Sequence, residues 1–134
     1  MSEPPDVRAL VAGHGDFAEG LVSAVGQITG LGGAFATLSN RDMSAADVER
    51  AMREEVDARG LDVIFTDLPA GSCTMAARRL QRERPAVVLV TGTNLATLLD
   101  FVFHTDVSAI EAALHAADKG RASLVATGGT PSGH

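Results

Sequence analysis

The stretch Val7-Arg8-Ala9-Leu10-Val11-Ala12-Gly13-His14-Gly15-Asp16 runs from a short apolar segment into a histidine that stands between two glycines. The apolar part is typical of a buried strand. In an open α/β sheet, ligands bind beyond the carboxyl ends of the strands, and glycines let other groups approach the backbone closely. His14 is therefore predicted to lie in a ligand-binding crevice, where an imidazole can act as a nucleophile, a proton carrier or a metal ligand.

Strand-like and helix-like segments alternate along the chain, which predicts a parallel sheet covered by helices. Two helices are expected to begin at Ser44 and Ser108, because Asp47 and Glu111 follow three positions later as in a capping box. Glycines at 30, 60 and 120 are expected to end helices. Further strands are expected at residues 34–38, 62–67 and 86–91, with a weaker fifth strand at 122–127.

Short parallel α/β chains commonly adopt the strand order 2-1-3-4. We therefore expect a three-layer α/β fold, with a mainly parallel sheet of that order and helices on both faces. Residues 1–127 are expected to form one domain, and residues 128–134 a disordered tail in which His134 has no role.

The composition limits the classes of function. The chain has 134 residues and a net charge of −6, and it lacks Trp and Tyr, so nucleic acid is not an expected partner. Its longest aliphatic run, at residues 86–90, is too short to span a bilayer, and the acidic start does not resemble a signal peptide. With Cys73 as the single cysteine, we expect a cytoplasmic protein without an internal disulfide, and we expect no cofactor and no metal site.

The strand order also predicts which loops meet. Strands one and three are neighbours, so His14 and Asp67 come together although they are far apart in the sequence. A carboxylate beside an imidazole can accept one ring N–H and leave the other nitrogen free to attack an electrophile. Gly71 and Ser72 lie at the start of the third helix, where unpaired N–H groups and a hydroxyl favour an anion. Together these residues predict a phosphate-accepting site.

Each candidate also has a purely structural interpretation. Asp67 could cap the turn before Pro69, and Ser72 could be an ordinary helix N-cap. The pair at residues 93–94 could line the crevice or only make a turn, and Cys73 is more typical of a buried helical cysteine than of a nucleophile. A basic face on the third helix is typical of a solvated surface, with docking of an acidic partner as the alternative. That face comprises Arg78, Arg79, Arg82 and Arg84.

Two other functions compete with a phosphohistidine carrier. Residues 13–18 match the dinucleotide pattern G-x-G-x-x-A, but the acidic residue expected after strand two is replaced there by Ser39-Asn40-Arg41. A receiver-like signalling domain would accept phosphate on an aspartate at the position of Asp67. Receivers carry acidic metal ligands after strand one and a lysine after strand five, and this chain has neither.

Three blocks of the chain, in the right order, resemble the mannose-type EIIA family of the bacterial phosphoenolpyruvate-dependent sugar phosphotransferase system (PTS). They are Gly13-His14-Gly15 after a strand, Asp67 followed by Gly71-Ser72 and an Ala-rich helix, and Gly92-Thr93-Asn94-Leu95. The resemblance covers residues 7–125. It implies a phosphotransferase in which His14 receives a phosphoryl group from the phosphocarrier HPr and passes it to an EIIB domain, while Asp67 orients the ring.

The resemblance also implies a homodimer in which the last strand crosses to the sheet of the partner. One loop departs from the family pattern. Relatives typically have an aromatic residue and two glycines between the aspartate and the serine, whereas Leu68-Pro69-Ala70 precedes a single glycine here. We expect this loop to be stiffer. The role of such a protein is sugar uptake or regulation, and the sequence identifies neither the sugar nor the partner EIIB.

Overall fold

The computed structural model describes residues 6–130, so His134 and the end of the expected tail lie outside the described part. Four parallel strands form one sheet in the order β2-β1-β3-β4, which confirms the predicted strand order. The strands are β1 (Ala9–Gly13), β2 (Phe35–Ser39), β3 (Val63–Thr66) and β4 (Val88–Val90). The central strands β1 and β3 are buried along their whole length.

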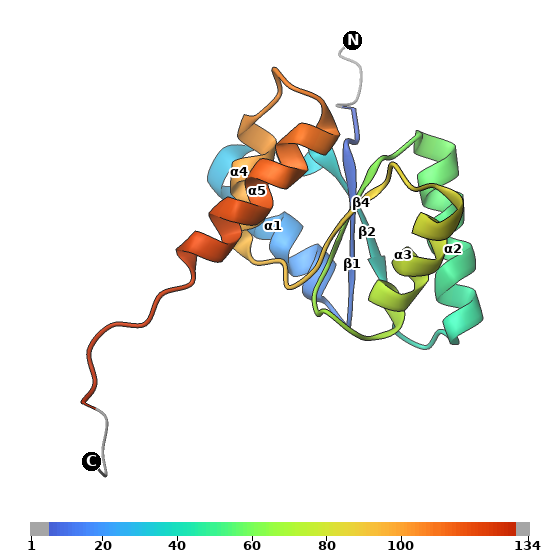
Figure 1. The fold of residues 1–134 in the computed structure, drawn as a ribbon, viewed down its shortest axis with the longest axis horizontal. Helices are drawn as coiled ribbons and strands as arrows, with labels where there is room; N and C mark the ends of the chain where they lie inside the picture. The colour runs from blue at the N-terminus through green and yellow to red at the C-terminus, as the bar shows by residue number, and fades with distance from the viewer. Residues whose placement is uncertain (1–5, 131–134) are drawn as a thin grey trace.

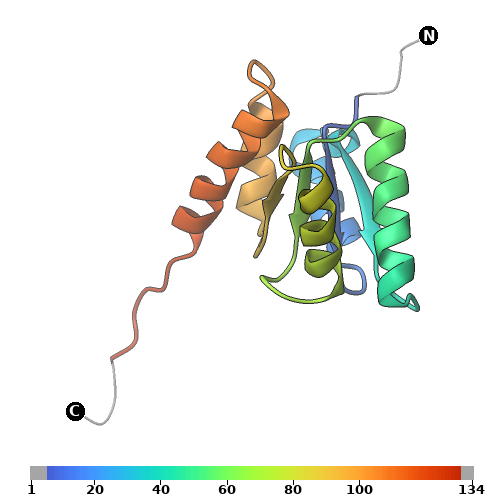
Figure 2. The ribbon, with the colours of Figure 1, turned by 45° about the vertical axis from the view of Figure 1, so that its right-hand side comes forward.

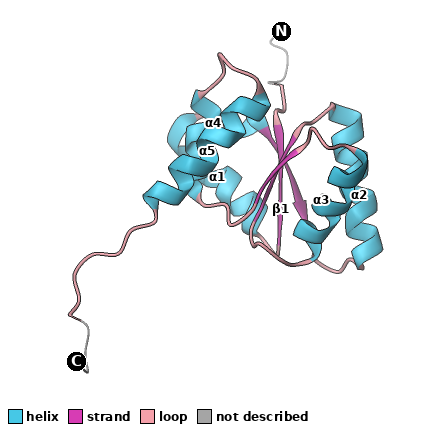
Figure 3. Cartoon of the chain, viewed as in Figure 1, coloured by secondary structure: helices cyan, strands magenta, loops and turns pink. Residues whose placement is uncertain are grey.

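Helices cover both faces of the sheet, so the predicted three-layer arrangement is confirmed (Figures 1 and 3). One face carries α1 (Phe17–Thr29), α4 (Leu95–Phe103) and α5 (Ala109–Ser123), and the other carries α2 (Ala45–Arg59) and α3 (Ser72–Glu83). A short 3-10 turn, η1 (Gly32–Ala34), leads into β2. Among the helices of residues 6–130, none is long and apolar enough to cross a membrane.

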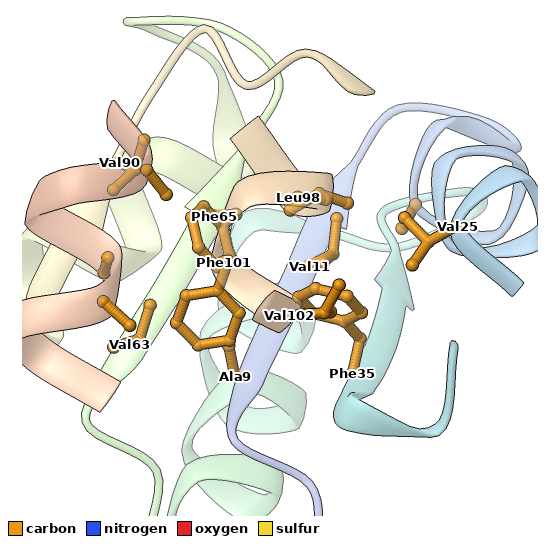
Figure 4. Packing of buried hydrophobic residues seen from close by; sticks show 14 residues of the cluster. Ala9, Val11, Val25, Phe35, Val63, Phe65, Val90, Leu98, Phe101 and Val102 are labelled. Atoms are coloured by element: carbon orange, nitrogen blue, oxygen red, sulfur yellow. The ribbon is translucent and has the colours of Figure 1, made fainter. Parts of the chain in front are cut away.

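Alternation along β1 divides the core between the two faces. Ala9 and Val11 pack toward α1, α4 and α5, whereas Leu10 and Ala12 pack toward α2 and α3. Three phenylalanines fill the first side, and their ring centroids lie 5.1 to 6.2 Å apart (Figure 4). They are Phe35, Phe65 and Phe101. This packing fixes how β2, β3 and α4 lie relative to one another, which helps to set the positions of the loops that follow the strands.

Local signals in the sequence determine where several helices begin. Ser44 and Asp47 form the predicted capping box at the start of α2. Ser108 Oγ accepts a hydrogen bond from the Glu111 N–H at the start of α5. Asn94 accepts from the Thr97 N–H at the start of α4, with the reciprocal bond also present. These bonds satisfy N–H groups that the first turn of a helix leaves without partners.

The structure from α5 onward differs from two of the expectations drawn from the sequence. Gly120 does not end α5, which continues to Ser123. Gly120 is instead buried where α5 meets α4, and a Cβ added to it would overlap Thr97 Oγ1. Asn94 Nδ2 donates to the Gly120 carbonyl, so the glycine lets the two helices approach closely.

The expected strand at residues 122–127 is the second correction. Ala122 and Ser123 belong to α5, and residues 124–130 pair with no strand of the described chain. This segment runs away from the body of the molecule (Figure 2), and Leu124 and Val125 are 83% and 73% exposed. An isolated strand has no stable hydrogen-bonding partner, so the apolar pattern alone does not produce one within a single chain.

Candidate functional site

The site lies where β1 and β3 end side by side. Ala12 is the partner of Thr66 in the parallel register, so the residues that follow these two strands face each other. The register thus brings His14 and Asp67 together across 53 positions of sequence. Gly13 makes room for the contact, because a Cβ there would lie 2.9 Å from Asp67 Oδ2.

His14 gives two hydrogen bonds to one oxygen of Asp67. The backbone N–H of His14 donates to Asp67 Oδ2 at 2.9 Å, and the ring Nδ1 atom lies 2.7 Å from the same oxygen. An ionised carboxylate can only accept, so Nδ1 carries the hydrogen in this contact. In the neutral ring the Nε2 atom is then unprotonated. The His14 side chain is 52% exposed, whereas that of Asp67 is only 10% exposed.

The environment favours the charged form of Asp67. Burial by itself raises the pKa of this carboxyl, but the hydrogen bonds from the backbone and ring of His14, together with the charge of a protonated ring, outweigh burial and hold the pKa below its ordinary value. Asp67 Oδ1 is buried without a hydrogen-bond partner among residues 6–130. The carboxylate therefore directs its hydrogen bonding entirely to His14 within this part of the chain.

The amino end of α3 lies against the outer edge of the His14 ring. Gly71 is the N-cap residue of α3, with no side-chain cap and a φ of 108°. A Cβ added to Gly71 would lie 3.2 Å from His14 Cε1 and 3.8 Å from Nε2. The first N–H groups of a helix carry partial positive charge and favour an anion. The free nitrogen of His14 is thus next to a helix start that suits a phosphoryl group.

Ser72 lies in the first turn of α3 and does not act as its N-cap, which is Gly71. Its hydroxyl instead accepts a hydrogen bond of 2.8 Å from Asn40 Nδ2, at the end of β2. The adjacent loop is anchored by the Thr74 hydroxyl, which lies 2.5 Å from the Leu68 carbonyl oxygen. Asp67 makes a hydrogen-bonded contact with His14 in place of the turn cap considered from the sequence.

Other residues raised by the sequence have structural surroundings. Thr93 is buried, and Asn94 caps α4 and bonds to Gly120, so this pair makes the turn and joins helices. Cys73 is buried beside Asp67, and burial followed by the negative charge of Asp67 raises the pKa of its thiol to about 11. On the basic face of α3, Arg79 and Arg84 form ion pairs with acidic residues of α2.

Two polar contacts beside the site were not predicted from the sequence. Asn40 supports Ser72, and Arg41 pairs with Asp16 at 3.0 Å over the loop that carries His14. Both residues follow β2, the strand beside β1 on the other side from β3. The sequence signal for them is a polar run, Ser39-Asn40-Arg41, directly after a strand.

The fold and site define a class: small parallel α/β proteins with an exposed strand-end histidine that is oriented by a carboxylate and lies at a helix start. The chain belongs to the family described as PTS system fructose IIA component (EIIA-man), whose model matches residues 8–118. This confirms the resemblance inferred from the sequence. No curated protein matches the chain in sequence.

Solved structures share this fold. The mannose/sorbose specific IIA subunit of the phosphotransferase system from Enterococcus faecalis is similar with a TM-score of 0.76 and 17% identity, over 95% of this chain and 98% of that one. Phosphotransferase system component EIIA from Streptococcus agalactiae has a TM-score of 0.71 and 21% identity, over 85% of this chain and 94% of that one. The PTS IIA protein associated with the fucose utilization operon from Streptococcus pneumoniae has a TM-score of 0.71 and 22% identity, over 90% of this chain and 93% of that one.

Proposed function

We propose that this chain is a phosphocarrier that accepts a phosphoryl group on His14 Nε2 from phospho-HPr and transfers it to an EIIB domain. The observation that carries the proposal is that only one of the two ring nitrogens, Nδ1, is hydrogen-bonded to Asp67. Nδ1 donates its hydrogen to Asp67 Oδ2 at 2.7 Å, so in the neutral ring only Nε2 has a free lone pair and can act as a nucleophile. Family membership supports a role in the sugar phosphotransferase system.

In the proposed transfer, the lone pair of His14 Nε2 forms a bond to phosphorus, and the bond between phosphorus and the donor breaks with its electron pair leaving on the donor. Both ring nitrogens are then substituted, since Nδ1 keeps its hydrogen, and the ring gains positive charge. The carboxylate of Asp67 stabilises that charge at hydrogen-bonding distance, as carboxylates do beside catalytic imidazoles. The reverse sequence delivers the group to the acceptor.

The start of α3 supplies the second part of the site. Gly71 brings backbone close to His14 Cε1 and Nε2 without a side chain between them, and Ser72 adds a hydroxyl. Phosphoryl oxygens carried on Nε2 would face these groups, which favour negative charge. We assign Gly71 and Ser72 a phosphate-binding role.

The decisive experiment incubates the full chain with phosphoenolpyruvate, enzyme I and HPr, and measures intact mass. We expect a gain of about 80 Da, the mass of one phosphoryl group, and no gain in His14→Ala. His115→Ala serves as the matched histidine control and should retain the gain. The modification should survive alkali and be lost in acid, as phosphohistidine is. Phosphate on Asp67, which is labile in both, would favour the receiver-like alternative.

We also propose a homodimer, the assembly that the resemblance implies. Two features of the monomer support it. β4 is an edge strand, and next to it lies a hollow of about 250 Å³ that is lined by Val90, Asn94, Gly120 and Leu124, among others. The apolar segment at residues 124–127 is exposed in the single chain. Pairing of this segment with the β4 edge of a second copy would cover both.

A further inference from the structure

A second cluster of polar side chains lies away from His14. Asp100 and His104 are one turn apart near the end of α4, and His115 faces them from α5. One donor atom from each residue lies within 4.8 Å of the other two. No metal site is expected from the sequence, in which the Asp-x-x-x-His spacing is the only local signal, because the contribution of α5 depends on packing.

The cluster lies near the amino ends of the strands, whereas the candidate phosphoryl site lies at their carboxyl ends. Arg8, just before β1, donates to the backbone carbonyls of His104 and Val107, whereas His14 follows the other end of β1. The turn between α4 and α5 lies beside the start of β1 in Figure 1. The two bonds from Arg8 hold the turn that carries His104. The cluster is therefore a separate site on a fixed part of the backbone.

We propose that Asp100, His104 and His115 bind a late first-row divalent cation, of which Zn²⁺ is the representative. Two imidazoles and one carboxylate are a donor set that suits Zn²⁺, and hard cations such as Mg²⁺ prefer all-oxygen sites. The geometry is close to what binding requires. His115 Nδ1 lies 2.7 Å from Asp100 Oδ2, and His104 Nδ1 lies 3.5 Å from it. Ligand atoms around tetrahedral zinc are about 3.3 Å apart, from bonds of about 2.0–2.1 Å.

The local charges favour a cation. Asp100 forms ion pairs only with His104 and His115 among the described residues, so no Arg or Lys of this part neutralises its carboxylate. His104 is the C-cap of α4, and the carbonyl end of a helix carries partial negative charge. The two imidazole rings lie only 4.3 Å apart between centroids.

The exposure of the ligands leaves room for a fourth one. The side chain of Asp100 is 13% exposed, while those of His104 and His115 are 34% and 50% exposed. Three protein ligands with solvent access are typical of zinc sites that keep one position for water or for a group from another molecule. His104 Nδ1 and His115 Nδ1 each donate to an oxygen of Asp100, so coordination at either Nδ1 atom moves the ring hydrogen to Nε2.

The test is calorimetric titration of the full chain with Zn²⁺, and in parallel with Mg²⁺. We expect about one Zn²⁺ per chain and no binding of Mg²⁺. His104→Gln and His115→Gln should each weaken Zn²⁺ binding by at least tenfold, as loss of one of three ligands requires. Co²⁺ in place of Zn²⁺ should give the visible absorption of a four-coordinate site, and His115→Gln should lose it.

The controls separate this cluster from other donors. His14→Gln and His134→Gln remove the other two histidines and should leave Zn²⁺ binding unchanged, as should Asp118→Asn, an exposed carboxylate on α5. His115 is an exposed helical residue, so His115→Gln should keep its helical circular dichroism spectrum. The proposal is overturned if the wild type binds no Zn²⁺ at millimolar concentration. It is equally overturned if binding survives His104→Gln with His115→Gln, or is lost in His14→Gln.

Discussion

One oxygen of Asp67 accepts two hydrogen bonds from His14, from the backbone N–H at 2.9 Å and from the ring Nδ1 at 2.7 Å. The backbone bond fixes the carboxylate to the end of β1, and the ring bond then fixes the imidazole to the carboxylate. The orientation of the ring therefore depends on the register between β1 and β3 and not on the flexible rotamers of His14 alone.

Asp67→Asn should slow phosphoryl transfer to His14 by well over tenfold while the fold stays intact. An amide can present its NH₂ to the ring and favour the wrong tautomer, and it cannot stabilise positive charge on the imidazole. The rate of mass gain from phospho-HPr measures the effect. Asp62→Asn, an exposed aspartate just before β3, is the matched control and should transfer at the wild-type rate. Wild-type transfer by Asp67→Asn would remove the orienting role of Asp67.

Gly71→Ala should lower both the stability of the fold and the rate of phosphoryl transfer to His14. The backbone at Gly71 has a φ of 108°, a region that costs other residues about 1–3 kcal/mol, and the new Cβ would lie 3.2 Å from His14 Cε1. Gly60→Ala shares the strain of a positive φ but contacts nothing within 4 Å. Urea unfolding should show a loss of stability in both variants, whereas transfer per folded molecule should fall only in Gly71→Ala. Equal transfer in the two variants would contradict the proximity argument.

Ser72→Ala should weaken transfer less than Asp67→Asn does, by a few-fold, because the N–H groups at the start of α3 remain available to the phosphoryl oxygens. The substitution also removes the acceptor of Asn40 Nδ2. Asn40→Ala therefore separates the two roles of the hydroxyl. If Ser72 contacts the phosphoryl group directly, initial rates should fall in Ser72→Ala and change less in Asn40→Ala.

The His14–Asp67 contact should make stability depend on pH in acid. The pKa of Asp67 is lower in the folded chain than its ordinary value of 3.8, so folding is favoured by the ionised form. This stabilisation is complete above the unfolded pKa and is lost as pH falls through the folded pKa. The difference in unfolding free energy between the wild type and Asp67→Asn should thus shrink from about pH 6 to about pH 2.5. A difference that stays constant would contradict the assignment.

Removal of residues 124–134 should convert a dimer into a monomer and reduce phosphorylation of His14. The cut is placed after α5, since residues 121–123 belong to that helix. Light scattering of the full chain and of the truncated chain gives the masses. Leu124→Asp should weaken the dimer as well, whereas Leu114→Asp, at an exposed leucine within α5, should not. A monomeric full-length chain would remove strand exchange and leave the histidine chemistry unaffected.

Much of the site was accessible from local sequence. A strand ending in Gly13-His14-Gly15, an aspartate at the end of another strand, and the strand order of short parallel folds were sufficient to place His14 next to Asp67. The helix starts at Ser44 and Ser108 were predicted for the same reason, because capping depends on residues only three positions apart. Periodicity and capping are properties of a short segment and need no knowledge of its neighbours.

Only the tertiary structure decided what depends on packing between distant segments. Gly120 has the sequence pattern of a helix terminator, but contact with Thr97 makes it a buried packing position within α5. The segment after α5 is apolar enough for a strand, yet a strand forms only where another edge pairs with it. His115 meets Asp100 because α4 and α5 pack side by side. Contacts between distant segments depend on the packing of whole elements, which no single stretch of sequence specifies.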